Sequence, residues 1–198
     1  MKDAFIKTPN LPENKVTLAC VGDFPEIKEA LKKEGINTLS FYNPELNEEV
    51  CKHQDMLLCH IGGKNIFLDA FQNKAVLEEE GFSVFSPNRL QRDYPYDVKL
   101  NVAVGKSLFI YNPKTIDPLL FEKLSYYGYT GYETKQGYSK CSVCFISENA
   151  AITEDASIYE ALKSSYLDTL LISKGDIYLS PKHYGFFGGS TMTNSSLP

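Results

Sequence analysis

Arginine is almost missing from this sequence of 198 residues, in which Arg89 and Arg92 are the only examples. Lysine and arginine together number 20 against 25 aspartates and glutamates, and the formal net charge is −5 at pH 7. Proteins bind nucleic acids through clustered cations that neutralise the phosphates. Because the sequence has neither a basic patch nor an arginine-rich arm, we expect no nucleic-acid partner.

Long apolar runs are missing as well. No segment approaches the roughly 18 consecutive apolar residues that a membrane-spanning helix requires. The N-terminal segment MKDAFIKTPNLPENK also lacks the apolar core of a signal peptide. We therefore expect no membrane partner and a cytoplasmic location. The five cysteines are an odd and modest number, which is typical of reduced thiols in the cytoplasm.

Hydrophobic residues, by contrast, make up 43% of the chain. This fraction is enough for a folded core and too high for a disordered chain. The length suits a single domain spanning residues 1–198. The sequence gives no indication of the oligomeric state.

Four segments carry the start and stop signals of helices: residues 22–35, 68–81, 116–128 and 153–166. Each begins with an aspartate that can accept hydrogen bonds from the first turn: Asp23, Asp69, Asp117 and Asp155. Glycine tolerates the left-handed conformation that commonly ends a helix, and it closes the first three segments. The fourth segment has no closing glycine.

Short runs rich in branched and aromatic residues flank each helix and predict strands. The preceding runs are KVTLACVG, MLLCHIGGKNIFL, VKLNVAVGKSLFIY and CSVCFISENAAIT. The following runs are INTLSF, FSVFSP, YTGYET and LDTLLIS. The repeated unit is therefore strand, strand, helix, strand. We count four units, roughly residues 15–50, 51–93, 94–135 and 136–180, and part of a fifth in residues 181–198.

The leading strands of these units also align with one another. Setting HQDMLLCHIGGKNIF over PYDVKLNVAVGKSLF places Asp55 on Asp97 and Cys59 on Asn101. Continuing through YSKCSVCFISENAAI and HYGFFGGSTM gives a set of corresponding polar positions: Asp55, Asp97, Asn101, Lys140, Cys144 and Ser190. Burying such residues is unfavourable unless they face one another, water or a ligand. A polar central channel meets that requirement, and so does a purely structural hydrogen-bond network.

The first unit lacks the polar leading strand, which a circular arrangement supplies from the C-terminal end. A ring of units also closes sheet edges that are otherwise exposed. Repeated strand-strand-helix-strand units around a channel resemble the pentein fold, the α/β-propeller of enzymes that modify guanidino groups. That class includes arginine and agmatine deiminases, dimethylarginine hydrolases and amidinotransferases.

Five stretches resemble most closely a bacterial family of uncharacterised proteins with that fold: HQDMLLCHIGG, YPYDVKLNVAVGK, QGYSKCSVCFI, GDIYLSP and YGFFGGSTM. The resemblance covers roughly residues 15–192. Members of that family continue past GGSTM, so we expect either that the fifth unit is incomplete in this chain or that its ring closes differently. The resemblance specifies the fold and does not specify a reaction.

The stretch KHQDMLLCHIGG is either a polar strand end with a structural histidine or part of a catalytic site. On a strand, alternate residues share a face, which places His53, Asp55 and Cys59 on one face and His60 on the other. Because a zinc site needs three or four converging ligands, we expect neither a metal nor another cofactor here. His53 and Asp55 do resemble the His-x-Asp pair of pentein enzymes. In those enzymes the histidine moves protons and the carboxylate holds the guanidinium group.

The C-x-x-C motif CSVC contains Cys141 and Cys144 in a predicted strand, where their spacing points them to opposite faces. This geometry suits neither a disulfide nor a chelate. Pentein enzymes attack the guanidinium carbon with a cysteine thiolate, and the resemblance makes both residues candidate nucleophiles, with Lys140 favouring the thiolate. Inert buried thiols are the alternative.

The glycine-rich stretch GFFGGSTM lacks the spacing of a phosphate-binding loop. Its glycines are expected to allow a close approach of two backbones at the channel.

Together these expectations describe a pentein-like protein that binds a small cationic or zwitterionic ligand. The expected substrate-binding residues are Asp55, Asp97, Asn101, Lys140 and Ser190, and the expected catalytic residues are His53, Cys141 and Cys144. If the protein is an enzyme, the resemblance implies a hydrolase, deiminase or amidinotransferase acting on guanidines. The alternative is a catalytically inactive scaffold or ligand-binding protein of the same fold.

Overall fold

The repeated unit of the fold is a β-hairpin followed by a helix and a third strand. The computed structural model describes residues 5–70, 74–180 and 183–193. In the unit that starts near residue 58, β3 (Leu58–His60) pairs antiparallel with β4 (Asn65–Leu68). After α3 (Ala75–Glu79), β5 (Ser83–Phe85) pairs parallel with β4. The strand-strand-helix-strand order predicted from the sequence is therefore confirmed for this unit.

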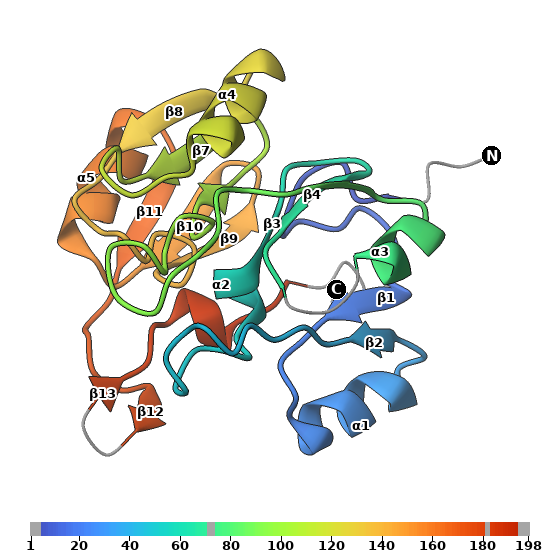
Figure 1. Cartoon of the computed structure of the whole chain (residues 1–198). Coiled ribbons are helices and arrows are strands. Elements are labelled where there is room, and N and C mark those ends of the chain that lie inside the picture. The colour runs from blue at the N-terminus through green and yellow to red at the C-terminus, as the bar shows by residue number, and fades with distance from the viewer. Residues whose placement is uncertain (1–4, 71–73, 181–182, 194–198) are drawn as a thin grey trace.

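The same topology occurs in two further units. One contains β6 (Ala103–Val104), β7 (Leu108–Tyr111), α4 (Pro118–Tyr126) and β8 (Thr130–Glu133). The other contains β9 (Val143–Ser147), β10 (Ala150–Thr153), α5 (Ala156–Ser164) and β11 (Asp168–Leu171). In Figure 1, α3, α4 and α5 lie at the periphery of the molecule and the sheets lie inside them.

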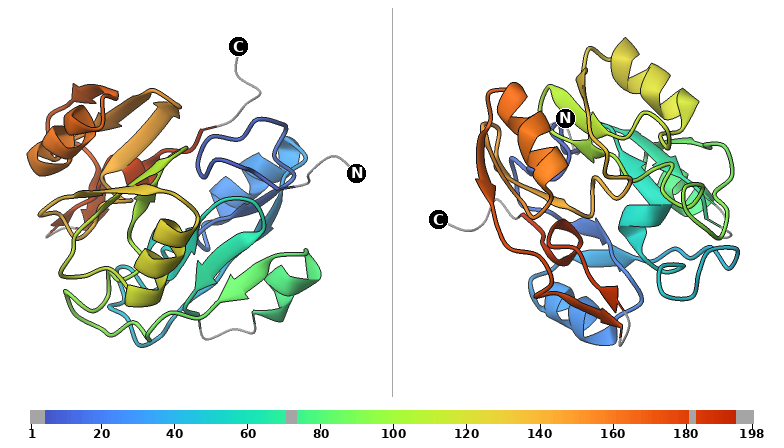
Figure 2. Two further views of the ribbon diagram at one scale, coloured as in Figure 1. Left: turned by 90° about the horizontal axis from the view of Figure 1, so that it is seen from above. Right: turned by 90° about the vertical axis from the view of Figure 1, so that its left-hand side faces the viewer.

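The two ends of the chain carry shorter versions of the unit. β1 (Leu18–Cys20) pairs parallel with β2 (Asn37–Leu39) around α1 (Pro25–Lys33), without a leading strand, as predicted. At the C-terminal end, β12 (Tyr178–Ser180) and β13 (His183–Tyr184) form a two-stranded sheet, and a short 3-10 helix follows at Gly188–Ser190. The two views of Figure 2 show that the successive units lie side by side. The fold is thus a mixed α/β arrangement of several small sheets with five α-helices in its described part.

Helix capping follows the sequence in two of the four helices. Asp117 accepts hydrogen bonds from the first turn of α4, and Asp155 does the same for α5. Asp23 does not cap α1: the residue before this helix is Phe24, and Asp23 pairs with Lys28 at 2.7 Å instead. α3 starts only at residue 75, so the Asp69 carboxylate is free to accept a hydrogen bond from the backbone of Leu90 at 2.6 Å.

The alignment of leading strands needs a correction of two residues. Cys59, Ala103 and Cys144 each pair with the third residue of the next strand: Phe67, Ile110 and Ile152. Cys59 therefore corresponds to Ala103 and not to Asn101. Side chains on a strand alternate between faces, so a shift of two residues keeps each side chain on its predicted face.

The core is built on both faces of β7. Phe109 and Tyr111 pack in one buried cluster, together with Leu57, Phe67 and other residues of the earlier units. Leu108 and Ile110 point the other way, into a second cluster that contains residues of β9 and α5. Because β7 is buried on both faces, it joins the two clusters into one continuous interior.

Candidate functional site

Three units contribute side chains to a cluster around Cys141. Asp55 lies in a single helical turn, α2 (Gln54–Leu57), Asn101 lies just before β6, and Cys141 lies just before β9. The Cys141 thiol donates a hydrogen bond to Asp55 Oδ2 at 2.8 Å, and Asn101 Nδ2 donates one to Cys141 Sγ at 2.9 Å. A carboxylate, a thiol and a carboxamide are therefore in direct contact.

Asn101 fixes the geometry of this cluster. Its side chain is only 1% exposed, and its Oδ1 accepts hydrogen bonds from the backbone N–H groups of Lys140 and Cys141 at 2.8 and 3.2 Å. Its Nδ2 also donates to the backbone oxygen of Asp55 at 3.1 Å. Both ends of the carboxamide are satisfied, so its orientation is determined and the amide N–H points at the sulfur.

The thiol of Cys141 is protonated in this environment. Burial raises the pKa of Cys141 well above its usual value, and the negative charge and hydrogen bond of Asp55 raise it further. The hydrogen bond from Asn101 and the charge of Lys140 act in the opposite direction and lower this pKa. The resting site is consequently a neutral thiol beside a carboxylate.

Asp55 is half-buried, and none of the described residues forms an ion pair with it. Gly189, which is exposed, lies beside it: a Cβ atom at this glycine would be 3.0 Å from Asp55 Oδ2. A side chain at this position would therefore press against the carboxylate.

Residues 186–191, which we call the C-terminal strap, cover Cys141 on the side of the 3-10 helix. Gly189 donates a backbone hydrogen bond to the Cys141 oxygen at 2.8 Å. A Cβ atom at Gly188 would overlap the backbone oxygen of Val143. The predicted close approach of two backbones at GFFGG is thus confirmed, and it explains why Cys141 is only 5% exposed.

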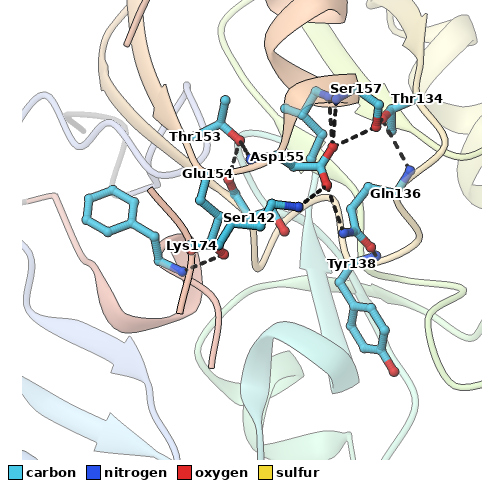
Figure 3. A network of polar contacts seen from close by, with 11 residues as sticks. Thr134, Gln136, Tyr138, Ser142, Thr153, Glu154, Asp155, Ser157 and Lys174 are labelled. Atoms are coloured by element: carbon cyan, nitrogen blue, oxygen red, sulfur yellow. Dashed lines mark hydrogen bonds and ion pairs between the residues drawn. The ribbon is translucent and has the colours of Figure 1, made fainter. Parts of the chain in front are cut away.

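A polar network at the start of α5 holds the strap (Figure 3). The Glu154 side chain is 3% exposed and accepts a hydrogen bond from the backbone N–H of Phe187 at 3.0 Å, and burial raises its pKa. The neighbouring Asp155 carboxylate accepts from Gln136 at 3.2 Å and from Lys174 at 3.1 Å. Glu154 and Asp155, at the start of α5, therefore connect this helix with the strap and with the segment around Lys174.

An aromatic wall lies next to the cluster. The Tyr138 ring stacks on Phe186 of the strap with centroids 5.2 Å apart, and on Tyr94 with centroids 6.1 Å apart. The Tyr138 hydroxyl donates to Asp97 Oδ2 at 2.9 Å. Asp97 is 3% exposed, burial raises its pKa, and its Oδ1 has no hydrogen-bond partner among the described residues. Asp97 thus orients Tyr138 through one carboxylate oxygen, and its other oxygen accepts no hydrogen bond from the described residues.

The prediction of a strand through His53 and Asp55 is wrong. The backbone oxygen of His53 accepts from the N–H groups of Met56 and Leu57, which makes a helical turn instead. The His53 ring lies edge-on to Phe24, with centroids 6.3 Å apart, and forms no hydrogen bond with Asp55 or Cys141 in the described part of the chain. The structure therefore separates the members of the predicted His-x-Asp pair.

The remaining predicted residues divide into two groups. The Lys140 ammonium donates to the Leu58 backbone oxygen at 3.3 Å, and its charge lowers the pKa of Cys141, which places it beside the cluster. Cys144 lies in β9, where it pairs with Ile152, and its thiol donates a long hydrogen bond to the backbone oxygen of Phe145 at 3.9 Å. Ser190 is exposed and donates to the Phe187 oxygen within its own turn at 2.7 Å. Neither Cys144 nor Ser190 belongs to the site.

The sequence analysis did not identify Tyr138, Glu154 or Phe186 as site residues. An acidic residue directly before a helix cap, such as Glu154, has the sequence signature of a solvated surface. The pairing of Tyr138 with Phe186 joins segments far apart in the chain, and no local pattern indicates it. All five cysteines are free thiols.

No group of three or more His, Cys, Asp and Glu side chains converges on a common point within residues 5–70, 74–180 and 183–193. None of the helices in this described part is long and apolar enough to cross a bilayer. No curated protein matches the chain. A family model does match residues 23–196, and the chain therefore belongs to the family described as "Family of unknown function (DUF6873)".

Proposed function

We propose that this protein is a pentein-like α/β-propeller whose central site binds a small guanidino or amidino compound at Asp55 and Cys141. The repeated hairpin-helix-strand units support the fold. The observation that carries the binding proposal is the 2.8 Å contact between a neutral thiol and a carboxylate that has no ion-pair partner among the described residues.

A guanidinium or amidinium group suits this site because it is planar and cationic. It pairs with a carboxylate through two parallel N–H···O hydrogen bonds, which are stronger than bonds between neutral groups. A half-buried carboxylate without a counter-ion gains more from such a partner than an exposed one does. The rings of Tyr138 and Phe186, which stack on each other, give the site an aromatic border for the rest of the ligand.

The same geometry supports a covalent reaction. In that reaction the Cys141 proton passes to Asp55, and the thiolate attacks the carbon of the bound guanidinium group. The C–N bond to the leaving amine then breaks, with a proton moving to the amine, and a thiouronium remains on Cys141. Water then attacks the thiouronium and releases a urea, which restores the thiol. The charge of Lys140 stabilises the thiolate, and Asp55 takes the role of proton carrier that the resemblance assigned to His53.

A binding protein without turnover is the second candidate. It is favoured by the burial of Cys141 under the strap and by its raised pKa, since a nucleophilic cysteine normally has a lowered pKa and is accessible.

A thermal-shift screen tests the binding proposal. The probes are arginine, agmatine, citrulline, methylated arginines and simple amidines. A ligand at 100 times its dissociation constant stabilises the folded state by about 2.7 kcal/mol. We expect a shift with at least one cation, its loss in Asp55→Asn, and its retention in the exposed control Asp168→Asn. No shift from any probe, or an undiminished shift in Asp55→Asn, contradicts the proposal.

Release of ammonia or an amine from the bound compound separates the two candidates. If the protein is an enzyme, the Cys141→Ser variant loses turnover but keeps the thermal shift caused by the ligand. A binding protein releases nothing in either form.

A further inference from the structure

Tyr166 has a backbone conformation that the other repeats reserve for glycine. Gly35, Gly81 and Gly128 follow their helices with φ angles of +74°, +91° and +84°. After α5 the same left-handed place is occupied by Tyr166, with φ +64°. A bulky residue is uncommon there because its Cβ crowds the backbone, whereas glycine adopts this conformation freely.

Burial does not compensate for this strain, because the Tyr166 side chain is 96% exposed. It has no apolar contact to gain by folding, and glycine at this place closes the helix at lower cost. A strained residue that persists without stabilising the fold points to a role outside folding.

Tyr166 borders a cavity of about 230 Å³. The cavity lies between the hairpin turn of β6 and β7, the hairpin turn of β9 and β10, and the segment after α5. β9 runs from the residues next to Cys141 at one end to this cavity at the other, so the cavity is separate from the candidate site.

The lining of the cavity is mainly polar, and its apolar floor is small. Leu108 and Phe145 are buried side chains of the floor. The rim carries Ser147 and Asn149, together with an ion pair between Lys106 and Glu148. Because the two opposite charges compensate each other, the rim does not favour an anion or a cation. Its hydroxyl, amide and charged groups still provide hydrogen-bond donors and acceptors.

We propose that this cavity binds a neutral monosaccharide, with the Tyr166 ring stacked on one face of the sugar. A pyranose ring presents hydroxyl groups at its edge and C–H groups on its faces, which matches a polar rim beside an apolar floor and an exposed aromatic ring. The volume suits one sugar ring. Tyr166 is one of the residues that line the cavity, and its exposed ring is free to pack on a bound sugar.

Saturation-transfer difference NMR on the full chain tests this proposal, because it detects weak binding. The probes are glucose, galactose, mannose and N-acetylglucosamine at millimolar concentration, with arginine and adenosine for comparison. We expect saturation transfer to at least one sugar and at least a tenfold loss of affinity in Tyr166→Gly. Asp55→Asn leaves sugar binding unchanged, which separates this proposal from the function proposed above.

Two variants sharpen the test. Tyr126→Ala removes an exposed tyrosine of α4, outside the cavity lining, and is expected to retain binding. The chain contains no tryptophan, so Tyr166→Trp creates a single fluorescent reporter whose emission shifts when a sugar binds. The proposal is overturned if no sugar binds the wild-type protein, if only arginine or adenosine binds, or if Tyr166→Gly binds as tightly as the wild type.

Discussion

At the scale of single residues, the contact between Cys141 and Asp55 controls the reactivity of the thiol. The negative charge of Asp55 raises the pKa of Cys141, so removing that charge lowers the pKa and increases the thiolate fraction at neutral pH. We expect Asp55→Asn to accelerate alkylation of Cys141 at pH 7.5, because a larger fraction of the thiol is then ionised.

Peptide mapping by mass spectrometry measures this rate for Cys141 alone, and Cys141→Ser identifies its signal. Asp168→Asn, with its charge on an exposed strand, serves as the control and leaves the rate unchanged. Equal rates in the wild type and Asp55→Asn would mean that the two side chains are not coupled.

Cys59 makes the free energy of unfolding depend on pH in the alkaline range. Burial raises the pKa of this thiol to about 11, with the charge of Lys140 opposing the change. As pH rises above about 9, the unfolded state releases the thiol proton while the folded state keeps it, so the free energy of unfolding falls until the folded thiol also ionises. A difference of about two pKa units corresponds to about 2–3 kcal/mol.

Urea titrations between pH 8 and 11 measure this loss. Cys59→Ala lowers the free energy of unfolding at pH 8, but the further loss toward pH 11 is expected to shrink by about 2 kcal/mol. Cys51→Ala, at a half-buried position, is the matched control. If Cys59→Ala shows the same pH dependence as the wild type, groups other than Cys59 cause the loss of stability at alkaline pH.

Tyr166 offers a stability test that is independent of sugar binding. The left-handed conformation costs a residue with a Cβ roughly 1–2 kcal/mol, and glycine removes this cost. The greater freedom of glycine in the unfolded chain offsets part of that stabilisation. Tyr166→Gly is expected to raise the free energy of unfolding by about 0.5–1 kcal/mol. The reverse substitution in another repeat, Gly128→Ala, is expected to lower it by about 1 kcal/mol. A loss of stability in Tyr166→Gly would show that the ring stabilises the fold.

At the scale of elements, the C-terminal strap determines how accessible Cys141 is. A methyl group at Gly188 overlaps the Val143 backbone, which cannot move without disturbing β9. Gly188→Ala is therefore expected to lift the strap, to cost about 1–3 kcal/mol of stability, and to increase the alkylation rate of Cys141. Ser190→Ala, an exposed change within the strap, leaves both quantities nearly unchanged. Unchanged alkylation in Gly188→Ala would mean that the strap does not protect the thiol.

The elements also show which features the sequence predicts. Helix α4 and its cap were predictable because Asp117, Pro118 and Gly128 are local signals. The start of α3 without a side-chain cap was not predictable, because Asp69 binds the distant Leu90 backbone instead, and no local pattern reveals such a partner. Asp55 and Asn101 were among the aligned polar positions, but their meeting with Cys141 was not predicted, because the alignment selected Cys144 and because Asp55 lies in a helical turn instead of a strand. The strap and its Glu154 anchor depend on long-range packing.

At the scale of the whole molecule, Asn101 joins three units through one carboxamide. It binds the backbone of Asp55 in one unit and of Lys140 and Cys141 in another, while its own backbone precedes β6. Removing the side chain leaves these buried groups without partners, at roughly 1–3 kcal/mol for each group that stays unsatisfied. Asn101→Ala is therefore expected to cost about 3 kcal/mol.

The two core clusters meet at β7, so this loss is expected to affect the entire chain as a single unfolding transition. A loss of about 3 kcal/mol lowers the melting temperature by about 6–12 °C in a protein of this size. Calorimetry should show one shifted transition, and hydrogen exchange should accelerate in β4, β7 and β10 together. The control Asn149→Ala changes an exposed hairpin turn and leaves the transition in place. Faster exchange confined to β10 would instead mean that the units open independently, and that Asn101 orients Cys141 without holding the molecule together.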